Sequence, residues 1–546
     1  MTRIFTIAAM AVAAAGLLAA QAGAQTPAAT GPGVSGGQLT WGVTTEPACF
    51  NPHRSSQQNA FLVIRNYVDS LVGKRADGVF VPWLATSWSV SPDGKAYTFQ
   101  LREDVKFHDG TPFDAEAVKA NFDFIRNPKS SAAAASFLEF YQRTEVVGRY
   151  TVRVVLSQPD SALLESVSSV KLGFLSPKTL AEDKDLCAGG PALVGTGPFI
   201  FEQYQRGQSA TFRRNPDYNW APAYAAHQGP AYLDRVTYRF LPEYAVRTGA
   251  LSSGQVDLIE GVQPTDISAF KGVKGFQYHT GPSSQTSFTL NINYRRGVAQ
   301  DIRVRRALRD GFDIDGLVRG VYLDTVPRAW SNIGPDNAGY SAKLKGSWGN
   351  RVAEANRLLD EAGWTGRDAQ GYRTKDGQRL SIEVGYPQPY VRDNRDVLIQ
   401  GIQAALRKNL GFELKLRLIS NGEWVKSTAE GSWIIYPNTL NPSDPALELR
   451  DVLGDTGFLY KEVPNPEAGR PDPEIAALIR EARATSDLAR RQPILDRIQA
   501  IAVDRAYVVP LFAPNYQVAA KSRVQGISFE AQLDSPANSY DLWIQQ

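Results

Sequence analysis

The stretch "FHDGTPF" sets His108 beside Asp109, two side chains that together could move a proton. A histidine held by a carboxylate can act as the general base that activates a nucleophile. Such chemistry needs a converging nucleophile, and the sequence offers none nearby. Because Asp109-Gly110 is a turn dipeptide, we interpret the pair as a structural corner in which His108 caps an edge.

A second candidate for chemistry is "SSVK" at residues 168–171, which matches the S-x-x-K of penicillin-binding enzymes. The partner motifs K-T-G and S-D-N do not occur in the chain. A secreted serine hydrolase of that type therefore stays an alternative function and not the favoured one. The glycine motif "GTGPF" at residues 195–199 lacks the third glycine of a dinucleotide-binding loop.

The histidines are too scattered for a metal centre. The chain has 4 of them, and no two are spaced as ligands on one helix or hairpin. They are His53, His108, His227 and His279. We expect neither a metal site nor a cofactor, and no catalytic residue is assigned.

The elements around the corner can be read from local patterns. "SWSVSPDGKAYTFQLREDVKF" predicts two strands joined at Asp93-Gly94, with alternate residues of the second strand on one face. After the corner Asp114 stands at the N-cap position of a helix. Apolar residues then recur at helical spacing: Val118, Phe122 and Ile125.

Helices and strands alternate through the rest of the chain. "DVLIQGIQAALRKNLGFELKLRLI" predicts a helix that ends at Gly411 and feeds a strand. "PDPEIAALIREA" predicts a helix capped by Asp472, and a further helix is expected from about Ile494. "AYVVPLF" predicts a strand. This alternation favours α/β lobes with mixed β-sheets flanked by helices.

The start of the chain predicts export. Residues 1–24 combine Arg3, an apolar run and an A-x-A cleavage site, as in a secretory signal peptide. Residues 25–37 are small, polar and turn-rich, typical of a flexible tether. No cysteine lies near the cleavage site, so we expect a cleaved protein that is soluble outside the cytoplasm and has no lipid anchor.

Length, charge and cysteines set further bounds. A chain of 546 residues is expected to form more than one domain. The net charge of +3 arises from 59 basic and 56 acidic residues mixed along the chain, which argues against a nucleic-acid partner. Cys49 and Cys187 form either a disulfide or two buried thiols.

Several stretches in series carry a family resemblance. "LATSWSVSPDGKAYTFQLREDVKFHDGTPFDAEAVKANFD" resembles the signature of the peptide/nickel class (family 5) of ABC-transporter extracellular solute-binding proteins, which includes oligopeptide- and dipeptide-binding proteins. The resemblance continues in "VGTGPF", "SGQVDLIEGV", "DIRVRRALRDGFDIDGLVRGVY" and "LIQGIQAALRKNLGFELKLRLI". It covers nearly the whole mature chain in the family's order.

The resemblance implies a two-lobed periplasmic binding protein with an enlarged first lobe and two crossover hinge strands. Lobe I would span residues 38–282, lobe II residues 283–510, and residues 511–546 would return to lobe I. We place the crossovers near Gly281 to Ser287 and near Pro510 to Asn515. The corner at His108 would then be scaffold of the larger lobe.

The resemblance also implies where ligand binds. In the first lobe it nominates Glu46, Pro47, Cys49 and Phe50 at the cleft rim. In the second lobe it nominates Tyr386, Gln388, Tyr390 and Arg392. Arg392 either grips a carboxylate through two hydrogen bonds or begins a solvated helix.

The chain departs from the family's peptide binders at one motif. Those proteins show W-x-x-D, whose aspartate holds the ammonium terminus of the peptide; here Trp433 is followed by Tyr436 at that position. A desolvated ammonium without a carboxylate would lose several kcal/mol. Either Asp444 takes that role, or the ligand presents hydroxyls, amides or aromatic faces to Tyr436, Asn438 and Trp433.

We therefore predict the substrate-binding component of an ABC importer. It would capture a small polar organic solute or short peptide between its lobes and deliver it to an inner-membrane permease, acting as a monomer and not as an enzyme. Besides the serine hydrolase, a solute sensor working without a transporter stays open. The sequence does not identify the ligand.

Overall fold

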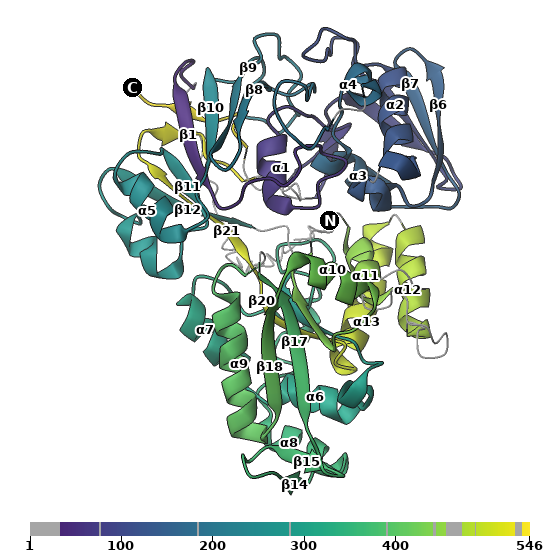
Figure 1. Cartoon of the computed structure of the whole chain (residues 1–546). Helices are drawn as coiled ribbons and strands as arrows, with labels where there is room; N and C mark the ends of the chain where they lie inside the picture. The colour runs from purple at the N-terminus through teal and green to yellow at the C-terminus, as the bar shows by residue number, and fades with distance from the viewer. Residues whose placement is uncertain are drawn as a thin grey trace, which may run out of the picture. The chain divides into compact units, whose positions relative to one another are not determined.

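Two mixed β-sheets carry the fold of the computed structural model (Figure 1). The model describes residues 33–546 except 76–77, 131, 183–184, 283–285, 389–390, 441–443, 455–471, 486 and 530–537. The larger sheet has seven strands in the order β12-β21-β11-β1-β10-β9-β8, and the smaller has five in the order β18-β17-β19-β13-β20. The predicted signal peptide and most of the predicted tether lie outside the described residues.

Parallel and antiparallel pairs occur in both large sheets. The seven strands are β1 (Gln38–Val43), β8 (Phe199–Gln205), β9 (Ser209–Arg214), β10 (Arg235–Phe240), β11 (Leu258–Glu260), β12 (Phe276–Pro282) and β21 (Asn515–Lys521). The five are β13 (Phe288–Ile292), β17 (Ser381–Pro387), β18 (Glu413–Ile419), β19 (Ile435–Asn438) and β20 (Val508–Phe512). Strand β1 runs parallel to β10 and β11, and β17 runs parallel to β18 and β19, while the remaining pairs are antiparallel.

The smaller sheets flank these two. A four-stranded sheet holds β4 (Ala85–Val90), β5 (Ala96–Leu101), β6 (Tyr141–Gly148) and β7 (Thr151–Leu156). The short strands are β2 (Val72–Lys74), β3 (Phe80–Pro82), β14 (Gly366–Arg367), β15 (Arg373–Lys375), β16 (Gln378–Arg379), β22 (Val524–Gln525) and β23 (Trp543–Ile544).

The α-helices alternate with the strands along the chain. They are α1 (Gln58–Ile64), α2 (Ala115–Arg126), α3 (Leu163–Ser168), α4 (Pro177–Ala181), α5 (Tyr244–Ser252), α6 (Ile302–Asp310), α7 (Ile314–Tyr322), α8 (Val352–Glu361), α9 (Arg395–Leu410), α10 (Asn421–Ala429), α11 (Pro445–Leu453), α12 (Pro473–Ala484) and α13 (Leu488–Asp504). Within the described part of the chain, no helix combines the length and hydrophobicity needed to cross a bilayer.

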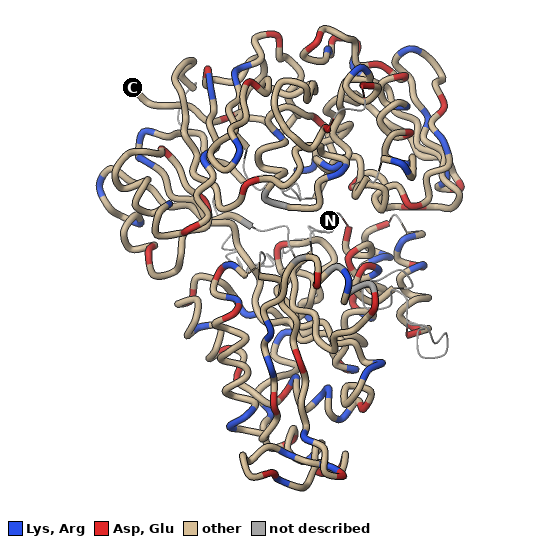
Figure 2. The backbone as a smooth tube through the Cα atoms, in the orientation of Figure 1, with Lys and Arg blue, Asp and Glu red and all other residues tan. Residues whose placement is uncertain are grey.

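Two large hydrophobic cores organise these elements. The first core is built on the seven- and four-stranded sheets and includes Val518 and Leu542 from the end of the chain. The second core is built on the five-stranded sheet, from Phe288 to Phe512. The chain passes from the first core to the second between β12 and β13, and it returns between β20 and β21. Figure 2 shows basic and acidic residues interspersed over both parts.

The predicted hairpin and helix ends are confirmed. Strands β4 and β5 pair antiparallel around Asp93-Gly94, where Gly94 adopts a φ of 69°. Asp114 accepts a hydrogen bond from the backbone N–H of Ala117 at the start of α2. Gly411 ends α9 in the left-handed conformation, which glycine adopts without steric cost.

One predicted boundary is wrong. The last long helix begins at Leu488, not near Ile494, because the side chain of Asp487 caps it through the N–H groups of Ala489 and Arg490. Pro493 lies inside this helix. The sequence interpretation did not recognise Asp487 as the cap.

The His108 corner is scaffold, as predicted. Its Nε2 lies 2.9 Å from the carbonyl oxygen of Gly197, and its backbone N–H donates to Gly195. Burial lowers the pKa of His108 to about 4, so the ring is neutral at pH 7. Asp109 accepts hydrogen bonds from the Thr111 N–H and the Ser176 hydroxyl.

The glycine motif next to this corner serves close packing. A Cβ at Gly195 would lie 1.8 Å from the carbonyl oxygen of Tyr67, and one at Gly197 would meet the same stretch of backbone at 2.6 Å. Only glycine allows two backbone segments to approach this closely. The motif "GTGPF" therefore joins the corner to the core and does not form a phosphate-binding loop.

Candidate functional site

The carboxyl ends of the parallel strands lie together at one edge of the five-stranded sheet. Strands β17, β18 and β19 run the same way and end at Pro387, Ile419 and Asn438. At this edge β13 enters from the first core and β20 leaves toward it. In open α/β sheets, ligands bind in the loops beyond the carboxyl ends of parallel strands. The loops that follow these ends are therefore the expected position of a ligand site.

The loop from β17 to α9 carries two arginines around one aspartate. Arg392 is 34% exposed, whereas Arg395 is 3% exposed. Asp393 lies within 3.6 Å of the Arg392 guanidinium and 3.4 Å of the Arg395 guanidinium. Burial, which has the larger effect, and the neighbouring charge of Arg395 both lower the pKa of Arg392.

The buried arginine is fixed by its surroundings. The Arg395 guanidinium carbon lies 4.8 Å from the centre of the Phe288 ring, and one of its nitrogens is 3.3 Å from the Thr439 hydroxyl. Its Nε has no hydrogen-bond partner among the described residues. A buried guanidinium N–H without a partner is costly, and an anionic ligand would satisfy it.

The loop backbone sets this geometry. Asp393 and Asn394 both have a φ of 53°, the left-handed region that Asn and Asp tolerate better than other non-glycine residues. The chain turns sharply there and enters α9 at Arg395. Arg392 and Arg395 thereby stand on either side of Asp393.

A carboxylate of the first core acts electrostatically on this loop. Glu260, at the end of β11, accepts hydrogen bonds from the Thr44 N–H and hydroxyl at 3.0 and 2.9 Å and from the Tyr516 hydroxyl at 2.5 Å. Tyr516 belongs to the crossing strand β21. Glu260 therefore ties the segment after β1 to one of the two connections between the cores.

Arg247 of α5 lies beside Glu260. Its buried guanidinium donates to the carbonyl oxygens of Leu241, Pro242, Glu260 and Gly261, at 2.6 to 3.1 Å. Because carbonyl oxygens carry no net charge, these hydrogen bonds do not neutralise the positive charge of Arg247. Burial lowers the pKa of Arg247, and the carboxylates of Glu260 and Asp393 act against that effect.

These groups form one electrostatic site, although they come from both cores. Asp393 of the second core acts on Arg247 of the first, and Glu260 of the first core acts on Arg392 of the second. Among these five groups the three arginines (Arg247, Arg392 and Arg395) outnumber the two carboxylates (Glu260 and Asp393) by one positive charge. A partly buried net charge of this sign favours an anionic ligand group.

Three of the nominated side chains lie with Arg392 at this edge. Tyr386 is buried at the end of β17, and Gln388 is exposed just beyond it. Asn438 ends β19, where its Oδ1 accepts a hydrogen bond from the Asn291 Nδ2 at 2.7 Å. Tyr390 lies outside the described residues.

Trp433 and Tyr436 have other surroundings. Tyr436 is fully buried, and its hydroxyl accepts from the Trp433 N–H and donates to the Ser427 carbonyl. The Trp433 ring packs on Gly385, with the Arg417 guanidinium 5.2 Å away. Both side chains thus pack against α10 and β17.

Asp444 also has a structural role. Its carboxylate caps α11 through the backbone N–H groups of Ala446 and Leu447 and binds the Arg491 guanidinium at 2.5 and 2.7 Å. Both of its oxygens are therefore engaged inside the second core, which leaves Asp444 no capacity for a ligand ammonium group.

The nominated first-lobe residues fasten a loop. Glu46 accepts hydrogen bonds from the Tyr204 hydroxyl and the Gly207 N–H, and Phe50 is fully buried against Tyr204. Pro47 is buried. Cys49 is joined to Cys187 in a disulfide. Of this segment it is Thr44, not a nominated residue, that reaches Glu260.

The sequence analysis missed Arg395, Glu260 and Arg247. A signal for Arg395 was present, because "RDNRD" spaces two arginines around an acidic turn at a helix start. Glu260 stands just before Gly261 in the quoted motif "SGQVDLIEGV", at a strand end. Nothing local indicates that Arg247 lies beside it.

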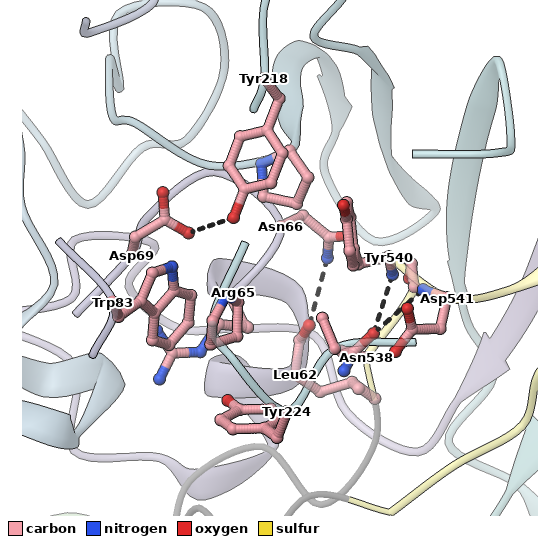
Figure 3. Close-up of a pocket in the computed structure, with 14 residues that line it drawn as sticks. Leu62, Arg65, Asn66, Asp69, Trp83, Tyr218, Tyr224, Asn538, Tyr540 and Asp541 are labelled. Atoms are coloured by element: carbon pink, nitrogen blue, oxygen red, sulfur yellow. Dashed lines mark hydrogen bonds between the residues drawn. The ribbon is translucent and has the colours of Figure 1, made fainter. Parts of the chain in front are cut away.

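A cavity inside the first core is not assigned to the solute. Its walls include Asp69, Trp83, Tyr218 and Asp541 (Figure 3). Asp69 accepts hydrogen bonds from the Tyr218 hydroxyl and Trp220 Nε1, and burial raises its pKa to about 6. All of the lining residues belong to the first core or the C-terminal segment, so a ligand there would not contact both cores.

The S-x-x-K sequence has no catalytic geometry. Ser168 is buried and donates its hydroxyl hydrogen to the Glu165 carbonyl at 2.7 Å. The Lys171 ammonium lies 4.4 Å from the centre of the Phe137 ring. Both side chains are packed into the first core.

Comparison with known proteins identifies the class of this two-core fold. The family model described as "Bacterial extracellular solute-binding proteins, family 5 Middle" matches residues 79–448, and the chain belongs to this family. The protein is thus a substrate-binding protein of the ABC-importer type, with the α/β fold of periplasmic binding proteins, and is not an enzyme.

Individual relatives agree with this assignment. The chain is 27% identical to the nickel-binding periplasmic protein of Escherichia coli (strain K12), over 90% of this chain and 91% of that one. It is 25% identical to the glutathione-binding protein GsiB of Salmonella paratyphi A, over 74% and 78% of the two chains. The crystal structure of NikA from Brucella suis in complex with Fe(III)-EDTA superposes with a TM-score of 0.81 at 27% identity, covering 93% of this chain and 100% of that one.

Proposed function

We propose that this protein captures a small polar organic solute through a carboxylate group and delivers it to an inner-membrane permease. The observation that supports the proposal is the surplus of positive charge where Arg247, Arg392 and Arg395 act with only two carboxylates, those of Asp393 and Glu260. A carboxylate matches the guanidinium group in charge and in hydrogen-bond geometry. The carboxylate end of a short peptide would be recognised in the same way.

We also propose that the two cores are the two lobes of the binding protein. Lobe I is residues 38–282 with the return of residues 511–546, and lobe II is residues 283–510. A solute that contacts Arg392 from one lobe and the Glu260 group from the other stabilises the closed arrangement by its difference in affinity for the two states. The two crossings, β12 to β13 and β20 to β21, would serve as the hinge.

Recognition does not use a ligand ammonium group in this proposal. Tyr436 occupies the position at which the family's peptide binders have an aspartate, and Asp444 is bound to Arg491. The Fe(III)-EDTA complex in the Brucella suis relative is a polycarboxylate. A ligand of that chemistry fits a site with a surplus of arginine.

We further propose that the protein works as a monomer in the periplasm, after cleavage of residues 1–24 and without a lipid anchor. Its partners would be the solute and the permease subunits of its importer. The nickel-binding relative, which is named as periplasmic, and the predicted signal peptide support this location.

The experiment is a thermal-shift screen with matched pairs of compounds. The set contains glutathione, dipeptides, citrate and Fe(III)-EDTA, each organic acid being paired with its amide or ester. We expect at least one carboxylate to raise the melting temperature of the protein, its neutral counterpart to have no effect, and Arg392→Gln to abolish the shift. The matched control is Arg417→Gln, which removes an exposed arginine of the same core outside the site. Equal shifts with neutral counterparts, or full retention in Arg392→Gln, would contradict the proposal.

A further inference from the structure

A second group of charged residues joins the two cores away from the arginine site. Arg483, in α12 beside the second core, forms ion pairs with Glu139 at 2.7 Å and with Asp160 at 3.0 Å. Glu139 and Asp160 lie next to residues of the first core. Arg450 of α11 also pairs with Glu139. These contacts link residues more than 300 positions apart in sequence.

Backbone contacts strengthen this connection. The N–H and the hydroxyl of Ser161 both donate to the carbonyl oxygen of Arg483, at 3.0 and 2.9 Å. That carbonyl belongs to the last turn of α12, where it has no partner within the helix. The Arg483 guanidinium carbon also lies 4.1 Å from the centre of the Phe140 ring. Residues of the first core therefore hold one end of a second-core helix.

The two arginines and Asp160 are buried, whereas Glu139 is partly exposed. The side chains of Arg483 and Asp160 are 6% and 7% exposed, and Arg450 is also buried. Lys171 and Asp451 extend the group, with Asp451 bound to Arg450 at 2.5 Å and within Coulombic range of Lys171. Three cations (Lys171, Arg450, Arg483) thus balance three anions (Glu139, Asp160, Asp451). Separating the cores would leave buried charges unpaired until water reached them.

This group is separate from the connections between the cores. Helix α12 packs on α13, and α13 packs on β20, the strand that leads into the return crossing. Helix α13 therefore lies between β20 and α12, the helix that carries Arg483. Opening about the crossings would have to break it.

We propose that Arg483, together with Glu139, Asp160 and Arg450, is a latch that holds the two cores in the closed arrangement and thereby sets the affinity for the solute without touching it. The apparent affinity of a binding protein falls with the fraction of molecules in the binding-competent state. These residues are positioning residues, and the effect on affinity rests on the proposed function.

The latch is tested by measuring the distance between the cores in the unliganded protein. Nitroxide spin labels are placed at Gln142 and Leu488, which are both exposed. Double electron–electron resonance then gives the distribution of distances between the two labels. We expect a population at the shorter, closed distance in the parent. In Arg483→Met more molecules should show a longer, open distance. The ratio of open to closed molecules should rise by a factor of at least about ten, because losing hydrogen bonds to a charged group changes an equilibrium constant by about that factor.

Further variants keep the test decisive. Glu139→Gln changes a partly exposed side chain and should shift the distances in the same direction even where Arg483→Met folds poorly. Arg483→Lys should restore part of the closed population. The matched control is Arg497→Met, which breaks an Arg–Glu ion pair between α12 and α13 within the second core and should leave the distances unchanged.

The outcomes separate this proposal from the proposed function. Unchanged distances in both Arg483→Met and Glu139→Gln would overturn the latch, whatever the solute. If the distances widen while none of the tested carboxylates binds the parent protein, the latch stands and the carboxylate proposal fails. If both hold, the affinity for the carboxylate found in the thermal-shift screen should weaken in Arg483→Met by the same factor as the closed population.

Discussion

The buried ion pair between Asp444 and Arg491 predicts that Asp444 stabilises the fold and does not bind the solute. Both side chains are 6% exposed, and the guanidinium binds the carboxylate through two nitrogens. Asp444 also caps α11, and the Arg491 Nε donates to the Ala482 carbonyl at 2.9 Å. The pair thus connects α11, α12 and α13, which carry part of the second core.

The loss of unfolding free energy can be worked out separately for the two roles of Asp444, the ion pair and the helix cap. Asp444→Asn keeps a good helix cap but leaves Arg491 buried without its carboxylate, and breaking such a pair costs about 3–5 kcal/mol of unfolding free energy. Asp444→Ala removes the cap as well and should cost about 1 kcal/mol more. Replacing both partners, as in Asp444→Asn with Arg491→Met, should cost less than the sum of the single changes, because no unpaired charge remains.

The ion pair also predicts a pH dependence. Burial alone would raise the pKa of the Asp444 carboxyl, but the charge and hydrogen bonds of Arg491, with the cap, keep it below its ordinary value. The stabilisation is therefore present above the ordinary aspartate pKa of 3.8 and is lost as the pH falls below it.

The assay combines urea unfolding, followed by circular dichroism, with titration of the carboxylate that the screen identifies. We expect Asp444→Asn to lower the unfolding midpoint strongly and to leave the solute affinity of the folded protein nearly unchanged. An unaltered midpoint together with loss of solute binding would refute the structural role of Asp444.

Three further predictions concern the first core. Replacing Cys49 and Cys187 by serine should destabilise the protein by about 5 kcal/mol on the chain-entropy model, because the disulfide closes a separation of 138 residues; urea unfolding of the double variant checks this, and a midpoint like that of the parent would contradict it. His108 should titrate by NMR with a pKa of about 4, so that acidification below its ordinary value of 6.5 protonates the unfolded chain first and destabilises the fold; titration near 6.5 would show that the ring is not buried. Gly195→Ala should prevent correct folding, because its Cβ would lie 1.8 Å from the Tyr67 carbonyl oxygen; a soluble variant with the parent's melting temperature would disprove this packing.

Local signals were enough to predict the scaffold. The Asp93-Gly94 hairpin, the Asp114 cap and the Gly411 helix end depend on residues within one turn of one another, and each is confirmed. The helix start at Leu488 was missed because its cap at Asp487 was not recognised. The series of family motifs predicted the fold class, which the comparisons show.

The site was less predictable because its partners are distant in sequence. The resemblance nominated the loop that contains Arg392 but not Arg395, which lies in the same loop and is buried by Phe288 from another strand. Asp444 was open to a ligand role until its partner Arg491, 47 residues away, was visible. Glu260 is charged in the sequence, but only the fold places it opposite Arg392.

The most direct test of carboxylate capture at Arg392 is native mass spectrometry of the protein purified from the cells that produce it, followed by identification of the released molecule after denaturation. We predict one small carboxylate per chain, chemically unchanged after incubation with the protein, and its absence from Arg392→Gln but not from Arg417→Gln. A bound molecule that lacks an acidic group, or one retained in full by Arg392→Gln, would contradict recognition through the arginine pair.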